Sequence, residues 1–235
     1  VDTDSTIDTP NGTIAGISVS NVNLNSVNSA LAIGDQNVTL SVTGSVIGSG
    51  NLTLSGSGTT TLSSNANTYS GSTNVTGGTL KLTGGGAANS TVNVSTGATL
   101  NITTTNASIK SLAGSGDVVL SGKTLTLENA NDTFSGVISG ASGNLSLTAG
   151  TQNLSGNNTY TGTTTLATGS HLTIGGAGRL GGGTYSGNIV NNGDFKYSSS
   201  ENQTLSGNIS GSGSVTKDTD NTSILTLSSL NSTYS

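Results

Sequence analysis

A short element made of threonine, a large apolar residue, serine or threonine, and glycine recurs along most of the chain. Its copies begin at Thr68, Thr133, Thr159, Thr184 and Thr204, and a truncated copy begins at Thr233. After a first gap of 65 residues, successive copies lie 20 to 29 residues apart. A period of this size, with two or three short strands, is typical of one coil of a β-solenoid, in which neighbouring coils build the core together.

Between these elements, apolar residues alternate with polar ones. The alternating apolar pairs include Leu80/Leu82, Val92/Val94, Leu100/Ile102, Leu125/Leu127, Leu172/Ile174 and Leu225/Leu227. Each pair places its side chains on one face of a strand. Asn11-Gly12 and Asn192-Gly193 are the only Asn-Gly pairs, too few for a hairpin-built sandwich. We therefore predict an all-β fold, a parallel β-helix of about 9 to 12 coils.

The aromatic residues are concentrated in the recurring element. Five of the seven occupy its second position, namely Tyr69, Phe134, Tyr160, Tyr185 and Tyr234. If successive coils stack in register, equivalent positions lie about 4.8 Å apart, which suits aromatic packing. We interpret these residues as an internal ladder or as corner fillers. The alternative is an exposed row that stacks against a ligand.

The composition excludes several classes of protein. Only 30% of residues are hydrophobic and 7% are charged, both well below the values of ordinary globular domains. A net charge of -5 and a single proline do not fit a disordered chain. The composition therefore favours short strands around a small apolar core. There is no cysteine for disulfides, and the few Lys and Arg residues are scattered. We predict no nucleic-acid partner.

Residues for catalysis or metal binding are sparse. The only histidine, His171, is predicted to face solvent. The densest charged groups are Asp194/Lys196/Glu201 and Lys217/Asp218/Asp220. We interpret both groups as polar loops. Asp132 is one of several isolated charges. Asp2, Asp4 and Asp8 form at most a weak cation site. Ser26–Ile33 is the one candidate helix. We predict no enzyme activity, no catalytic residue, no cofactor and no metal.

Two segments share a longer pattern. Asn67–Leu82 and Asn158–Leu166 both begin with an Asn-Thr-Tyr-(Ser/Thr)-Gly turn that leads into a short threonine-rich strand, and the first copy continues through Gly-Gly into Thr-Leu-Lys-Leu. The second copy departs at Ala167–His171, where Gly-Gly is not kept. The pattern resembles the passenger-associated transport repeat, also described as the autotransporter-associated β-strand repeat, of bacterial autotransporter passengers. The resemblance covers roughly residues 50 to 235.

The resemblance implies a right-handed parallel β-helix on the surface of a Gram-negative bacterium or secreted from it. It also implies export by a C-terminal membrane barrel of the same precursor, which is not in this chain. We expect residues 1–45 to form N-terminal coils or a cap. Residues 46–235 are expected to form the repeat region and to continue beyond Ser235.

The expected function is a non-catalytic stalk or adhesive segment that contributes to adhesion or aggregation. Its partner would be a host or bacterial surface ligand, protein or glycan, or a second copy of the chain. One alternative is a self-assembling filament or sheath subunit. Another is a threonine-rich face that binds a glycan or ice, built from residues 59–61, 103–105 and 163–165. A polysaccharide-cleaving enzyme is a further alternative that lacks the grouped charged residues it would need.

Overall fold

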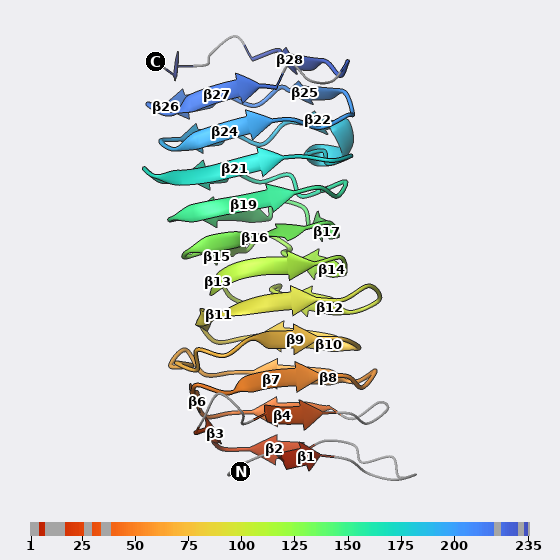
Figure 1. The fold of residues 1–235 in the computed structure, drawn as a ribbon, viewed down its shortest axis with the longest axis vertical. Coiled ribbons are helices and arrows are strands. Elements are labelled where there is room, and N and C mark those ends of the chain that lie inside the picture. Colours follow the sequence, from red (N-terminus) through yellow and green to blue (C-terminus); the bar gives the residue numbers. More distant parts are fainter. Residues whose placement is uncertain are drawn as a thin grey trace.

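The computed structural model describes residues 5–7, 17–25, 30–33, 39–218, 222–229 and 233–234. Their strands stack as a parallel β-helix of about ten turns, with the two termini at opposite ends (Figure 1). The strand pairings between them are parallel. The strands nearest the reader in Figure 1 run from left to right while the chain climbs, which is the sense of a right-handed helix. The predicted fold class is confirmed.

Each coil has three faces, which we name A, B and C in chain order. Face A contains β3 (Val22–Leu24), β6 (Val46–Gly48), β15 (Thr124–Leu127), β18 (Asn144–Leu147), β20 (Thr164–Leu166), β23 (Ile189–Asn191), β26 (Ile209–Gly211) and β29 (Thr233–Tyr234). Face B contains β1 (Ser5–Ile7), β4 (Ala30–Ile33), β7 (Asn51–Leu54), β9 (Thr73–Val75), β16 (Ala130–Phe134), β19 (Gly150–Leu154), β21 (Ser170–Ile174), β24 (Asp194–Tyr197) and β27 (Ser214–Lys217). Face C contains β2 (Ile17–Val19), β5 (Leu40–Val42), β8 (Thr59–Leu62), β10 (Thr79–Leu82), β12 (Thr99–Asn101), β14 (Asp117–Val119), β17 (Val137–Ser139), β22 (Thr184–Tyr185), β25 (Gln203–Leu205) and β28 (Leu225–Leu227).

Two long strands join face A to face B. β11 (Gly86–Val94) and β13 (Ala107–Gly114) begin on face A and end on face B. One 17-stranded sheet therefore contains face B and all of face A except β3 and β6, which form a two-stranded sheet of their own. The register of their pairing shifts between Ala87 and Thr91. A shift of this kind lets a strand bend at a corner without ending.

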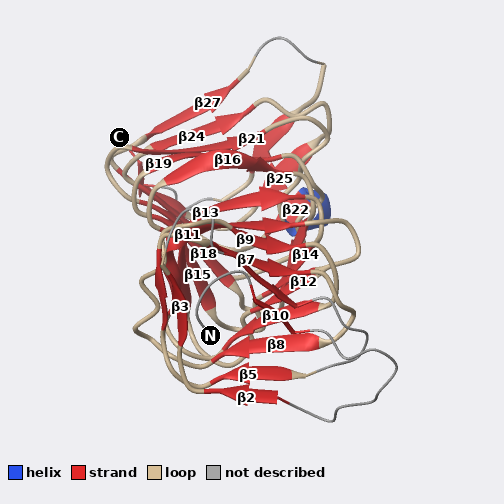
Figure 2. Cartoon of the chain, turned by 60° about the horizontal axis from the view of Figure 1, so that its bottom comes forward, coloured by secondary structure: helices blue, strands red, loops and turns tan. Residues whose placement is uncertain are grey.

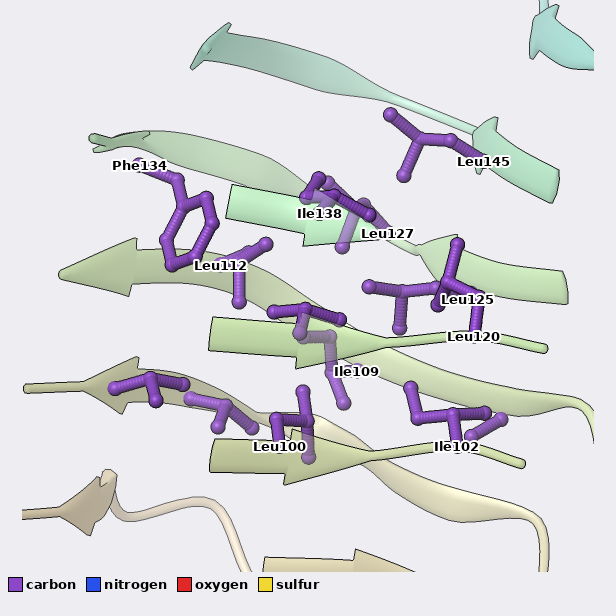
Figure 3. Close-up of a cluster of buried hydrophobic side chains, with 14 of the residues drawn as sticks. Leu100, Ile102, Ile109, Leu112, Leu120, Leu125, Leu127, Phe134, Ile138 and Leu145 are labelled. Carbon is purple, nitrogen blue, oxygen red and sulfur yellow. The ribbon is translucent and has the colours of Figure 1, made fainter. Parts of the chain in front are cut away.

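The core is a set of ladders that run along the helix axis. On face C, one inward ladder consists of Leu40, Thr60, Leu80, Leu100, Val118 and Ile138. All of these side chains are buried. Figure 3 shows apolar side chains from facing strands, such as Leu100 and Ile109, packed into the interior between them. Because only inward positions have to be apolar, a chain of low hydrophobic content still encloses a continuous core.

Helix is almost absent from the described residues. The short 3-10 helix η1 (Gly181–Gly183) projects from the side of the stack (Figure 2). The candidate helix at Ser26–Ile33 is wrong for Ala30–Ile33, which forms β4 and pairs with strands of both neighbouring coils; residues 26–29 lie outside the described residues. None of the described residues forms a helix that is long and apolar enough to cross a membrane.

Candidate functional site

The asparagine that opens each longer repeat is buried and links three coils. Asn67 accepts a hydrogen bond from the backbone N–H of Val46 in the preceding coil, at 2.9 Å. Its amide donates to the carbonyl of Gly86 in the following coil, also at 2.9 Å. Asn158 makes the equivalent bonds to its own neighbouring coils. These side chains satisfy backbone groups at a corner, where the strand ladder is interrupted.

The tyrosine of the first repeat starts a chain of buried hydroxyl groups. Tyr69 Oη lies 2.6 Å from Thr73 Oγ1, which lies 2.7 Å from Ser90 Oγ. Ser90 then donates to the carbonyl of Gly71 at 2.7 Å. Because a carbonyl can only accept, the proton order is fixed: Tyr69 donates to Thr73, and Thr73 donates to Ser90. We call this chain the hydroxyl relay.

The second repeat has its own hydroxyl relay. Tyr160 bonds to Thr164 at 2.9 Å, and Thr164 bonds to Tyr185 at 2.8 Å. Tyr185 donates to the carbonyl of Gly162, so the proton order is the same as in the first repeat. Here the third member is a tyrosine of the next coil, whose ring meets that of Tyr160 edge-on with centroids 5.5 Å apart.

The relay tyrosines are poorly suited to acid–base chemistry near neutral pH. Burial raises the pKa of Tyr69 and that of Tyr160 to about 12. Burial also raises the pKa of Tyr185, and the neighbouring Tyr160 adds to that shift. All three therefore remain neutral donors, and the arrangement stabilises coil stacking.

The glycine of the recurring element lies where two coils approach closely. A Cβ placed on Gly187 would lie 1.9 Å from the carbonyl oxygen of Gly162, and one on Gly207 would lie 2.0 Å from that of Gly187. No side chain fits at such distances, so the fourth position of the element has to be glycine.

Four of the five recurring aromatic residues are internal, as predicted, and the side chain of Tyr234 lies outside the described part of the structure. The fully buried ones are Tyr69, Phe134, Tyr160 and Tyr185. They do not form one ladder, since Tyr69 lies in the corner segment that continues face A and Phe134 lies on face B. Tyr160 and Tyr185 stack on face C, where Leu205 is the register partner of Tyr185.

His171 faces solvent, and its side chain is 48% exposed. Its Nδ1 lies 2.7 Å from Asp194 Oδ2, while Ser214 donates to Asp194 Oδ1 at 2.6 Å. The hydrogen bond from Ser214 lowers the pKa of Asp194, and the charge of His171 adds to the effect. The three residues are register partners on β21, β24 and β27. The aspartate stands between the other two, so this is not the order of a catalytic triad, in which histidine contacts the serine.

The interpretation of the densest charged groups as polar loops is wrong for three residues. Asp194 and Lys196 are on strand β24, and Lys217 ends strand β27. Asp194 and Lys196 alternate with the buried Phe195 and Tyr197, so both occupy outward strand positions, whereas Lys217 is the register partner of the buried Tyr197.

Two further ion pairs join charged residues of the described part of the chain. Lys196 pairs with Asp218 at 2.9 Å, and Arg179 pairs with Glu201 at 3.5 Å. Within the part of the chain that the structure describes, no three histidine or acidic side chains are close enough together to hold a metal ion. Asp2, Asp4, Asp8 and Asp220 lie outside the described residues.

The structure does not bring the three threonine runs together. Residues 59–61 lie on face C, residues 103–105 follow β12, and residues 163–165 lead into β20 on face A. The middle residues of two runs, Thr60 and Thr164, are buried. The runs therefore do not form the flat outward array that was considered.

The outer surface of face B has hollows in the part of the chain that the structure describes. A cavity of about 410 Å³ is lined by residues that include Lys110, Asn131, Asp132 and Thr151. A second, of about 290 Å³, shares the last three residues and extends to Asn153. The third, of about 370 Å³, lies over β21, β24 and β27 beside the His171–Asp194 pair.

The first cavity lies where the ladder of face B is interrupted. β13 and β16 share a single register pair, Gly114 with Phe134, whereas β16 and β19 are paired along their whole length. The buried Gln152 reaches from the next coil and donates to the carbonyls of Leu112 and Asp132, at 2.9 and 3.0 Å. In the sequence Asp132 is an isolated charge, which did not indicate a site. The available signal was Gln152, a polar residue at a strand position where alternation requires an apolar one.

Two segments of the chain, residues 52–82 and 149–170, match the family described as passenger-associated-transport-repeat. They include the corners of Asn67 and Asn158, so the predicted resemblance is confirmed there. No match was found among curated proteins or among solved structures. The repeats and the fold fit an autotransporter passenger, a family that implies a surface or secreted location in Gram-negative bacteria.

Proposed function

We propose, from the two passenger repeats and the helix that contains them, that this chain is a non-catalytic stalk segment of an autotransporter passenger. In this role it holds other parts of the protein away from the bacterial surface and contributes to adhesion or aggregation. The surface charge pairs and buried tyrosines described above suit a structural role better than a catalytic one.

The observation that carries the proposal is the continuity of the stack. Face B contains register pairs from β1 through to β27, although only one pair joins β13 to β16. Side-chain bonds between coils, such as those of Asn67 and Asn158, reinforce it. A stack in which each coil contacts its neighbours keeps its length and direction, which is what a stalk requires.

Small-angle X-ray scattering with circular dichroism tests the shape. About ten turns at about 4.8 Å each predict a rod roughly 50 Å long, rich in strand. A compact sphere or an expanded coil would contradict the proposal. Beads coated with the chain test the adhesive part, through their binding to cells and to one another.

Removal of one coil gives a sharper test. Residues 124–143 form a complete coil, and their register partners begin 20 residues later, with Thr124 opposite Asn144. Their deletion should shorten the rod by about 4.8 Å and leave it folded. Deletion of residues 124–133 alone is the matched control, because it shifts the faces out of register and should prevent folding. A folded control with an unfolded full-coil deletion would contradict the stacking that the stalk requires.

A further inference from the structure

We propose that the hollow on face B between β13 and β16 is a binding site for a neutral, hydroxyl-rich glycan. The proposal names the ligand for the adhesive part of the proposed function, on which it rests. The site is the cavity of about 410 Å³ together with the adjoining one of about 290 Å³.

The charged groups at this site differ from those farther along face B. The His171–Asp194 and Lys196–Asp218 pairs satisfy one another at 2.7 and 2.9 Å. Among the described residues, no ion pair involves Lys110 or Asp132, although both line the first cavity. The carboxylate of Asp132 thus keeps its acceptor positions for a ligand, and the ammonium of Lys110 keeps its donors.

The other lining groups are amides and hydroxyls. Asn129, Asn131 and Thr151 each offer both a donor and an acceptor to the first cavity. Asn153 lines the second. Sugar hydroxyls also donate and accept, and a carboxylate can accept from two adjacent hydroxyls. This combination matches a polyol.

A peptide is a poorer match for the same surface. The lining of the first cavity contains no large apolar side chain to receive an anchor residue. A peptide could instead add as a strand to a free sheet edge, but the hollow lies between two strands within the stack, and β16 is already paired along its whole length with β19.

The hollows extend along the axis in a direction that suits a linear polymer. Thr151 is the register partner of His171, and Asn153 is that of Thr173, so the second cavity adjoins the rows that line the third. Each coil adds a pair of outward polar side chains about 4.8 Å beyond the last, as His171 and Thr173 follow Thr151 and Asn153. A glycan lying along the axis would meet similar groups on each coil.

The break in the ladder explains why the hollow exists. A single register pair between β13 and β16 leaves carbonyls that Gln152 has to satisfy from another coil. Such irregularities are found preferentially next to binding sites, because they re-aim side chains. Asp132 is the register partner of the buried Gln152 and yet lines both outer cavities, so the break turns its side chain outward.

Nuclear magnetic resonance of the ¹⁵N-labelled full chain tests the proposal. The probes are a hexamer of glucose, a hexamer of N-acetylglucosamine, a sulfated heparin hexasaccharide and a basic decapeptide. At least one neutral hexamer should shift the amides of residues 129–133 and 151–153 saturably. Asp132→Asn should weaken this binding about tenfold, because a charged acceptor is lost. Asp117→Asn, a matched change at an exposed position on face C, should leave it unchanged.

Four results would overturn the proposal. They are the absence of shifts at millimolar sugar, shifts spread over all three faces, equal weakening by the two variants, and stronger binding of the heparin fragment or the peptide at the same amides. Scattering profiles of both variants separate this proposal from the stalk. If the chain is a rod that binds no sugar, only the glycan-site proposal is contradicted. If the chain is not a rod, the stalk proposal is contradicted.

Discussion

The two longer repeats begin on different faces of the helix. The first places its tyrosine corner in continuation of face A, with β9 on face B and β10 on face C. The second places its tyrosine corner in continuation of face C, with β20 on face A and β21 on face B. Both nevertheless contain the same asparagine bonds and the same hydroxyl relay. The repeat therefore encodes a corner and two strands, and different corners of the coil can accommodate it.

The third member of the relay is where the copies differ. In the first it is Ser90, a small residue in the middle of β11. In the second it is Tyr185, which belongs to the next copy of the recurring element and also packs its ring on Tyr160. The second relay therefore couples two copies of the element through both a hydrogen bond and an apolar contact.

Removal of either relay ring should have the largest effect. Tyr69→Ala and Tyr160→Ala each leave a large buried cavity, so we expect each to lower the free energy of unfolding by about 3–5 kcal/mol. Tyr160→Ala should cost more, since it also loses the edge-on contact with Tyr185. Denaturant unfolding measures both. Equal costs would mean that the ring contact adds nothing to the second repeat.

High pH should lower the free energy of unfolding through both relays, because their buried tyrosines would ionise. The pKa of Tyr69 and of Tyr160 is raised from 10.0 to about 12 in the folded chain. A raised folded pKa favours the neutral form, so this stability is complete below pH 10 and is lost between pH 10 and 12, by up to roughly 3 kcal/mol per tyrosine. Unfolding free energies at pH 9 and 11.5 measure it. The double variant Tyr69→Phe, Tyr160→Phe is the control and should lose less stability over that interval.

Loss of a corner asparagine should cost somewhat less. Asn67→Leu and Asn158→Leu keep the side-chain volume but leave the N–H of Val46 or of Ile138 without its partner. An unsatisfied buried donor costs about 1–3 kcal/mol, and both copies should show a similar value. Thermal or denaturant unfolding tests this. A cost near zero in one copy alone would show that the corners are not equivalent.

The smallest effects should come from the third member of each relay. Ser90→Ala and Tyr185→Phe each remove one hydroxyl and end the relay at its threonine. Each should cost about 1 kcal/mol in unfolding free energy. Thr165→Ala, at a position next to the relay threonine that is not buried, is a matched control and should cost at most about 0.5 kcal/mol. A Ser90→Ala cost equal to that of the control would mean that the first relay contributes no stability.

Much of the fold could be predicted because its rules are local. Alternating pairs such as Leu80 and Leu82 fixed which side chains point inward, and the fixed position of the aromatic residues indicated burial. The errors came where neighbouring coils decide. Asp194 was assigned to a loop because of its charge, although the buried Phe195 and Tyr197 that follow it alternate as in a strand. Asp132 was overlooked because the break between β13 and β16 is marked not at Asp132 itself but one coil later, by the polar Gln152 at an inward strand position.

The sequence by itself determined the parallel β-helix and its approximate number of coils, and it favoured an internal position for Tyr69, Phe134, Tyr160 and Tyr185, because alternation and period depend on near neighbours in the chain. Only the tertiary structure decided which face each repeat occupies and which residues complete its relay. Ser90 and Gly71 are 19 residues apart, and Tyr185 and Gly162 are 23 apart. Such partners meet only when the lengths of the intervening strands and turns add up to a whole coil, a sum over many residues that no single motif contains.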